Sequence, residues 1–174
     1  MNAISPTRVA LAGETYFMGR GMSAKPPQSI GANTLTPDLI ALVQSSFAKV
    51  VPIADAAAGL FYNRLFEIAP EVKPFFRHDM QKQGRKLMTT LGLVVGSLKN
   101  LDAILPAVTA LAVKHVGYGV VPAHYEHVGE ALIWTLEKGL GEDFSPETRS
   151  AWLATYAALS SVMIAEAYGE KAAA

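Results

Sequence analysis

Hydrophobic residues recur at helical spacing through most of the chain, from residue 35 to residue 168. In the first such stretch, one face carries apolar residues three or four positions apart: Leu39, Leu42, Val43 and Phe47. This spacing is typical of an amphipathic α-helix. No segment alternates apolar and polar residues over the length of a strand. The pattern therefore predicts an all-α fold of six or seven helices without an internal repeat.

Sequence signals for helix starts occur near both ends of this region. Thr36-Pro37-Asp38 and Ser145-Pro146-Glu147 each combine a capping residue, a first-turn proline and an early acid, the order expected where a helix begins. Pro52 is expected to end the first helix. The helices expected between these signals cover residues 53–68, 80–98, 101–116 and 122–140, with the third interrupted at Pro106.

The first 34 residues differ from the rest because they are rich in glycine, serine, proline and asparagine and show little periodicity. We predict a flexible N-terminal extension over residues 1–34, followed by one domain over residues 35–174. Met22 is an alternative start of the chain. A total of 174 residues is the length of a single domain with its own core.

Composition and charge remove several classes of function. Fifteen basic and fifteen acidic residues cancel, and the isoelectric point is near 6.9, so binding to nucleic acid or to an anionic membrane is not expected. The chain has no cysteine, which excludes disulfides, iron–sulfur clusters and covalent haem attachment. No apolar run approaches the roughly 20 residues of a membrane-spanning helix. We expect a cytoplasmic protein.

Familiar catalytic motifs are missing, and the carboxylates are scattered. The residues with distinctive chemistry are histidines and polar side chains within apolar helices. His115 lies four residues after Leu111 and therefore on the same helix face. It is either a half-buried structural histidine or a ligand to haem iron, which needs only one protein ligand.

The other polar residues also have two interpretations from local sequence alone. Gln83 and Leu87 are four residues apart on one helix, where Gln83 is either solvated or part of a site. Tyr62 lies in an apolar helix, where packing alone would explain it. His124 and His127 lack a third ligand nearby, so we predict that they lie at the surface. We predict that His78 is solvated.

Taken in order, these residues resemble a globin, specifically the bacterial single-domain relatives of flavohaemoglobins, with some likeness to neuroglobin. The resemblance covers residues 35–168. It implies a globin fold around one haem, in which the following residues contact the cofactor or its surroundings: Tyr62 over the haem, Phe76 against the porphyrin, Gln83 at the ligand-gating position with Leu87 one turn on, Leu111 and the iron ligand His115, and Tyr125 behind that histidine.

The resemblance implies haem b, bound without a covalent link. The second ring nitrogen of His115 should donate to a backbone carbonyl one turn earlier. Tyr62 and Gln83 should donate to O₂ and slow its release, whereas CO should benefit less. NO is the third expected ligand, and NO dioxygenation would need a separate reductase. Because Gln83 is not a histidine, we expect no second histidine on the iron; His78 is the nearest substitute.

Two features depart from flavohaemoglobins. Their C-terminal flavin and nicotinamide reductase has no counterpart before the chain ends. Their last-helix glutamate, which faces the proximal histidine, aligns with Ala167, and Glu166 lies one residue early. One residue turns a helix by about 100°, so we do not expect Glu166 to take that place. A haem-free helical interaction module is the alternative from a different class.

Overall fold

The structure, a computed structural model, describes residues 35–76 and 79–169. Within these residues six α-helices follow one another, joined by short loops and 3₁₀ turns, with no strand: α1 (Pro37–Val50), α2 (Ala54–Ile68), α3 (Met80–Gly96), α4 (Leu105–Gly117), α5 (Pro122–Leu140) and α6 (Pro146–Tyr168). The predicted all-α fold is therefore confirmed. The predicted extension with Met22, and His78, lie outside the described residues.

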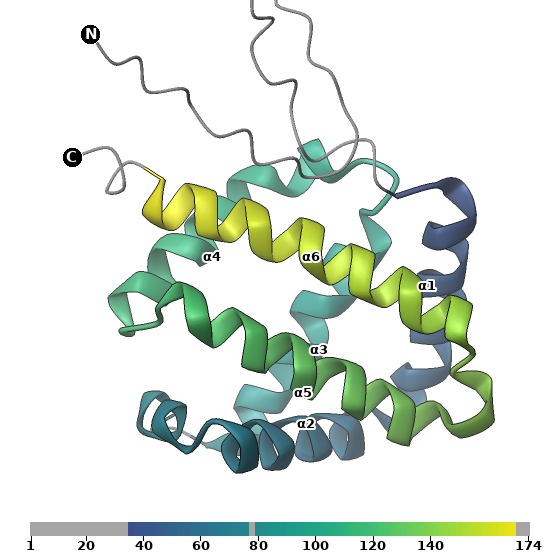
Figure 1. Cartoon of the computed structure of the whole chain (residues 1–174), viewed down its shortest axis with the longest axis horizontal. Coiled ribbons are helices and arrows are strands. Elements are labelled where there is room, and N and C mark those ends of the chain that lie inside the picture. Colours follow the sequence, from purple (N-terminus) through teal and green to yellow (C-terminus); the bar gives the residue numbers. More distant parts are fainter. Residues whose placement is uncertain (1–34, 77–78, 170–174) are drawn as a thin grey trace, which may run out of the picture.

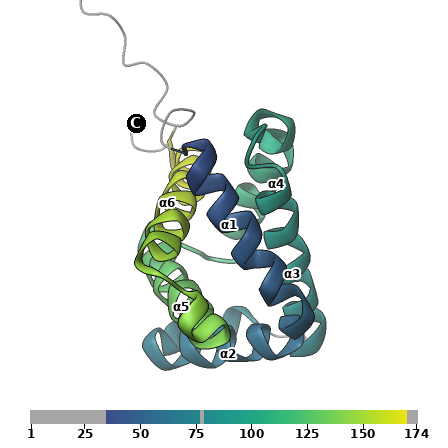
Figure 2. The ribbon, with the colours of Figure 1, turned by 90° about the vertical axis from the view of Figure 1, so that its right-hand side faces the viewer.

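The helices form two layers that α1 and α2 connect. Figure 1 shows α5 and α6 running side by side across the front, with α3 behind them. In the view turned by 90°, α3 and α4 lie on one side and α5 and α6 on the other, with α2 beneath both (Figure 2). The main packing partners are α2 with α5, α4 with α6 and α1 with α6.

Most predicted helix boundaries agree with the structure. Thr36 caps α1 by accepting the backbone N–H of Leu39 at 3.3 Å, and Ser145 caps α6 in the same way through Thr148 at 3.2 Å. The prediction at Pro106 is wrong. This proline lies in the first turn of α4, where its missing N–H removes no helical hydrogen bond, so it begins the helix and does not interrupt it.

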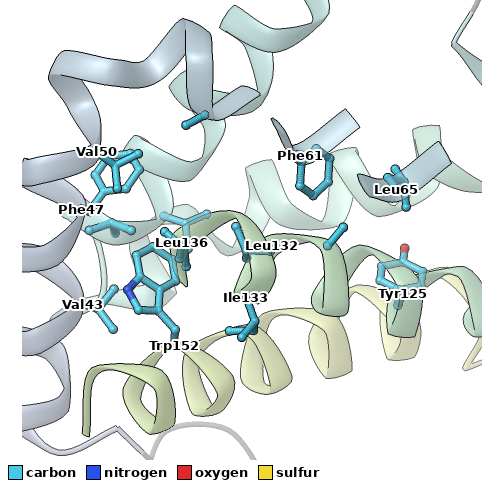
Figure 3. Close-up of a cluster of buried hydrophobic side chains, with 14 of the residues drawn as sticks. Val43, Phe47, Val50, Phe61, Leu65, Tyr125, Leu132, Ile133, Leu136 and Trp152 are labelled. Carbon is cyan, nitrogen blue, oxygen red and sulfur yellow. The ribbon is translucent and has the colours of Figure 1, made fainter. Parts of the chain in front are cut away.

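The main core lies between α1, α2, α5 and α6. Trp152 of α6 is 2% exposed, packs against Phe47 of α1 with ring centroids 6.2 Å apart, and donates its indole N–H to Ser46 at 2.9 Å. Because a buried indole N–H without an acceptor is costly, this bond fixes α6 against α1. Figure 3 shows Trp152 beside Val43 and Phe47, with Phe61 and Leu65 of α2 above α5.

The continuous helical run from Pro37 to Ile68 is long and apolar enough to cross a membrane by length and composition, with a mean hydropathy of 1.4 over its best window. That run is more apolar than the sequence analysis recognised. In the fold its buried residues, Val43 and Leu65 among them, belong to the main core. Of the apolar window 28% is buried inside the structure, where α1 packs on α6 and α2 packs on α5.

Candidate functional site

The predicted site residues fall into two groups on different helices. The distal group comprises Tyr62 on α2, Phe76 directly after the 3₁₀ helix η2 (Pro70–Phe75), and Gln83 and Leu87 on α3. The proximal group comprises Leu111 and His115 on α4 and Tyr125 on α5. Contacts join Tyr62, Phe76 and Gln83 in the distal group, and Leu111, His115 and Tyr125 in the proximal group. Leu87 lies one turn after Gln83 on α3.

Aromatic packing fixes Tyr62. Its side chain is buried, and its ring lies 5.2 Å from that of Phe76 in an edge-on arrangement and 5.9 Å from that of Phe66. Phe66 and Phe76 also contact each other, at 5.4 Å. Edge-on aromatic contacts of this kind are favourable beyond their buried area, so the turn after η2 and helix α2 hold the tyrosine ring from two sides.

The hydroxyl of Tyr62 is close to the amide of Gln83. Burial raises the pKa of Tyr62, and a hydrogen bond with the Gln83 side chain offsets part of this rise. The phenol is therefore neutral at physiological pH and keeps its proton to donate. Gln83 is half-buried in the first turn of α3, and Leu87, one turn later, is partly buried against the core.

A close helix contact makes this approach possible. Gly84, the residue after Gln83, is buried, and a Cβ atom at this position would lie 2.9 Å from the Cβ of Ala58 on α2. Real Cβ atoms essentially never come this close, so only glycine lets α3 cross α2 at this separation. The crossing places the start of α3 beside the half of α2 that carries Tyr62.

On the proximal side, a backbone carbonyl orients the ring of His115. The Nδ1 atom lies 2.9 Å from the carbonyl oxygen of Leu111, one turn earlier, which is the contact that the sequence predicts. Because a carbonyl can only accept, Nδ1 carries the proton and Nε2 keeps its lone pair. The histidine is half-buried, and its backbone carbonyl accepts the N–H groups of Tyr118 and Val120, each at 3.1 Å.

Tyr125 stacks behind His115. The two rings are 6.3 Å apart at an angle of 28°. Tyr125 is 7% exposed, and its hydroxyl has no hydrogen-bond partner among the described residues. Burial, followed by the nearby Tyr168, raises the pKa of Tyr125 to about 12. Figure 3 shows this hydroxyl at one end of α5, pointing to the side where Leu65 of α2 lies.

Among the residues that the structure describes, no carboxylate completes the proximal group. Glu166 is exposed and accepts a hydrogen bond from the Thr109 hydroxyl at 3.1 Å. Ala167, at the position aligned with the flavohaemoglobin glutamate, is partly buried against the core. The expectation that Glu166 would not take that place agrees with this geometry.

Sequence reasoning missed two tyrosines on α6 that support the proximal group. Tyr156 donates its hydroxyl to the carbonyl of Tyr125 at 2.5 Å, and Tyr168 donates to the carbonyl of Val120 at 2.5 Å. Each is half-buried. The available signal in the sequence was the presence of tyrosines in a helix otherwise rich in alanine. His124, expected at the surface, is half-buried and accepts the N–H of Val121 at 3.2 Å, so it caps α5.

The donor set fits haem. Within residues 35–76 and 79–169 no three histidine, cysteine or acidic side chains gather as metal ligands, so His115 could hold a metal only if other donors came with it. Haem brings four ring nitrogens and needs one histidine. In addition, α3 and α4 make almost no direct contact, while Leu87 and Leu111 on these helices stay only partly buried. A flat, largely apolar group between them would bury these side chains further.

Together, the all-helical fold and the arrangement of Tyr62, Gln83 and His115 are typical of one class of protein, the haem-binding globins. The globin family model matches residues 59–163. The chain belongs to the globin family.

Known relatives agree with this assignment. The chain is 31% identical over 133 residues to a flavohemoprotein of Vibrio cholerae, and this match covers 75% of the chain and 34% of that protein. A flavohemoprotein of Xylella fastidiosa is 30% identical over 126 residues, with 71% and 32% covered. The chain therefore spans about a third of the length of these relatives, whose family and names imply haem binding.

Solved structures support the same fold. An engineered carbene transferase from Rhodothermus marinus, made from a candidate nitric oxide dioxygenase, aligns with a TM-score of 0.72 and 25% identity, covering 80% of this chain and 97% of that one. A globin from Campylobacter jejuni aligns with a TM-score of 0.70 and 23% identity, covering 79% and 99%. The second likeness concerns the fold alone.

The unpartnered hydroxyl of Tyr125 gives a stability prediction. In haem-free protein, Tyr125→Phe should keep or raise the free energy of unfolding, by up to about 1 kcal/mol, because it removes a buried polar group without breaking a bond. Tyr156→Phe, the matched control, should lose about 1 kcal/mol because it breaks the bond to the Tyr125 carbonyl. Urea unfolding followed by circular dichroism measures both. An equal or larger loss for Tyr125→Phe would show that its hydroxyl has a partner.

Proposed function

We propose that this globin binds haem b without a covalent link, with His115 as the protein ligand to the iron, and that it holds O₂ tightly. The observation that carries the proposal is the contact between His115 Nδ1 and the Leu111 carbonyl. This contact fixes the tautomer in which Nε2 is free to ligate a metal, and it sets the orientation of the ring.

Two distal donors support tight O₂ binding. Haem, when bound, supplies a ferrous iron that takes O₂ and shifts negative charge onto it. The Tyr62 hydroxyl and the Gln83 amide can each donate a hydrogen bond to a charged ligand. Such a bond contributes about 1.5–3 kcal/mol, or about tenfold to a hundredfold in affinity. CO acquires little charge and gains less from the same donors.

The proximal surroundings favour binding over cleavage of the O–O bond. A carboxylate behind the proximal histidine would make the ring more basic and push electron density toward the iron. In this chain the partner of His115 is a neutral carbonyl, and Glu166 is engaged with Thr109. The histidine is therefore a moderate donor, suited to reversible ligand binding.

The distal side chains also shape the space around the ligand. Leu87 is an apolar side chain one turn after Gln83 and would limit both ligand size and entry of water. Gln83 is a weak metal ligand compared with histidine, so we expect it to leave the sixth coordination position to O₂, CO or NO.

The test is the rate of O₂ release from the haem-loaded protein, measured by stopped flow. Tyr62→Phe and Gln83→Leu should each speed release about tenfold to a hundredfold, because each removes one donor to a charged ligand. Their CO release rates should change less.

Two controls match these substitutions. Tyr118→Phe changes an exposed tyrosine, and Gln81→Leu changes an exposed glutamine two residues before Gln83; neither should alter release by more than about twofold. If O₂ release from the Tyr62 and Gln83 variants stays at the rate of the unmodified protein, the distal donors do not hold the ligand.

A second candidate function is NO dioxygenation, in which O₂ and NO combine to nitrate and the haem is left ferric. The same pair of distal donors supports it, together with the similarity to the Rhodothermus marinus chain and to flavohemoproteins. Each turnover needs one electron, which we expect a separate reductase to deliver.

Mixing the oxygenated protein with one equivalent of NO tests this second function. We expect one nitrate and one ferric haem per protein within the mixing time. Formation of a stable NO adduct without nitrate would exclude the reaction for this chain.

A further inference from the structure

The end of α4 is folded back onto the backbone of His115. The N–H of Val120 donates to the His115 carbonyl at 3.1 Å, and the N–H of Gly119 donates to the Val116 carbonyl at 2.9 Å. Gly119 has a φ of +87°, a left-handed conformation that favours glycine. Such a pair of bonds around a left-handed glycine is the Schellman motif, which ends many helices. Because His115 supplies one of the two acceptors, the motif ties the backbone of this histidine to Val120.

A tyrosine from another helix holds the same valine. Tyr168, the last residue of α6, donates its hydroxyl to the Val120 carbonyl at 2.5 Å, which is at the short end of the range for O–H···O hydrogen bonds. Helix α6 packs on α4, and Figure 1 shows its yellow end beside α4. Val120 is therefore bonded through its N–H to His115 and through its carbonyl to α6, so hydrogen bonds lead from Tyr168 to the backbone of the histidine.

The imidazole of His115 lies at the other end of this connection. Its Nδ1 atom lies 2.9 Å from the Leu111 carbonyl oxygen, so the histidine is held both by its side chain and by its own backbone carbonyl. The backbone bond restricts where the Cα atom lies, and the Nδ1 bond restricts how the ring turns about it. The direction in which Nε2 points depends on both bonds. A hydrogen bond that holds the end of α4 therefore also limits how far the ring can tilt.

Tyr156 makes the same kind of bond without this connection. It lies earlier on α6, donates its hydroxyl to the Tyr125 carbonyl at 2.5 Å, and packs closely on α5, where a Cβ atom on Gly129 would lie 2.6 Å from its ring. Tyr156 therefore joins α6 to α5. Tyr125 contacts His115 through its ring, and helix α5 keeps that ring in place without the bond to its carbonyl. Tyr156 is thus a matched control for Tyr168.

We propose that Tyr168 is a positioning residue for the proximal histidine: its hydroxyl fixes the end of α4, and the fixed helix end holds the imidazole of His115 in one orientation. The inference rests on the proposed function, because the orientation matters for a bond to iron. That bond is strongest when the lone pair of Nε2 points straight at the metal, and a tilted ring weakens it. The last helix thus acts on the metal ligand through the backbone of Val120.

Resonance Raman spectra of the haem-loaded ferrous protein without a gas ligand test this role through the iron–histidine stretching band. In Tyr168→Phe the band should move to lower wavenumber and broaden, because the ring samples more tilts. In Tyr156→Phe it should stay at the position of the unmodified protein. Both variants should lower the midpoint of urea unfolding of the haem-free protein by similar amounts, because each loses one hydroxyl-to-carbonyl bond. Lost stability alone therefore cannot produce the difference in the band.

A second pair of variants acts on the helix end and leaves Tyr168 unchanged. Gly119→Ala puts a side chain on left-handed backbone, which is unfavourable, although its Cβ atom would meet only the Phe75 ring, at an ordinary 3.6 Å. We expect the band to shift in the same direction as in Tyr168→Phe. The control is Gly141→Ala at the end of α5, where φ is also positive, +56°, and the space around a Cβ atom is open. It should leave the band unchanged.

Hydrogen exchange of the Val120 amide, measured by NMR, reads the same connection in haem-free protein. Tyr168→Phe should speed this exchange about fivefold, because the bond that restrains local opening is lost, and Tyr156→Phe should not. An iron–histidine band that is unchanged in Tyr168→Phe, or equally shifted in Tyr156→Phe, would overturn the inference, and so would unchanged exchange. An unmodified protein without an iron–histidine band would instead contradict the proposed function, and the exchange rates would then still decide whether Tyr168 holds the end of α4.

Discussion

The candidate site depends on one constraint: α3 and α4 are supported by other helices and almost not by each other. Helix α3 packs on α1 and α2, and α4 packs on α6. The bond between Trp152 and Ser46 joins α6 to α1, and it therefore links the supports of both helices. Because the two helices are held independently, their half-buried side chains can pack against the haem that we propose.

The two sides of the site are built by different means. On the distal side, side chains determine the chemistry, since Tyr62 and Gln83 supply the donors and the Gly84 crossing brings their helices together. On the proximal side the backbone has this role. The Leu111 carbonyl orients His115, and two tyrosine hydroxyls of α6 bond carbonyls around it. A carbonyl partner pushes less electron density onto the histidine ring than a carboxylate would, whereas donors on the other side favour a charged ligand. This asymmetry supports the proposal that the protein holds O₂ and does not cleave it.

Much of the fold and of the candidate site could be predicted from the sequence, because these features depend on interactions between residues close together in the chain. Helix periodicity and the capping signals at Thr36 and Ser145 placed the helices, and the ordered set of tyrosine, phenylalanine, glutamine and histidine indicated the family. The prediction at Pro106 was wrong because proline breaks the interior of a helix but is favoured in its first turn. The sequence did not show where α4 begins.

The residues that support the proximal side could not be predicted from local sequence either. Tyr156 and Tyr168 act on residues 31 and 48 positions away, and no spacing along α6 indicates such partners. The role of Gly84 depends on the position of Ala58 on another helix. Interactions of this kind follow from how the helices pack. By contrast, the bond from His115 to Leu111 lies within one helix turn and was predictable.

The central claim is that His115 is the protein ligand to haem iron. Its most direct test is the absorbance spectrum of the protein loaded with haem, recorded in ferric, ferrous and CO-bound forms for the unmodified chain, for His115→Gly and for His127→Gly as the matched histidine control. We expect a Soret band with the CO-bound spectrum of a histidine-ligated haem in the unmodified chain and in His127→Gly. We expect His115→Gly to lose that spectrum and to recover it when imidazole is added. An unchanged spectrum in His115→Gly, or the absence of a Soret band in the unmodified chain, would contradict the account.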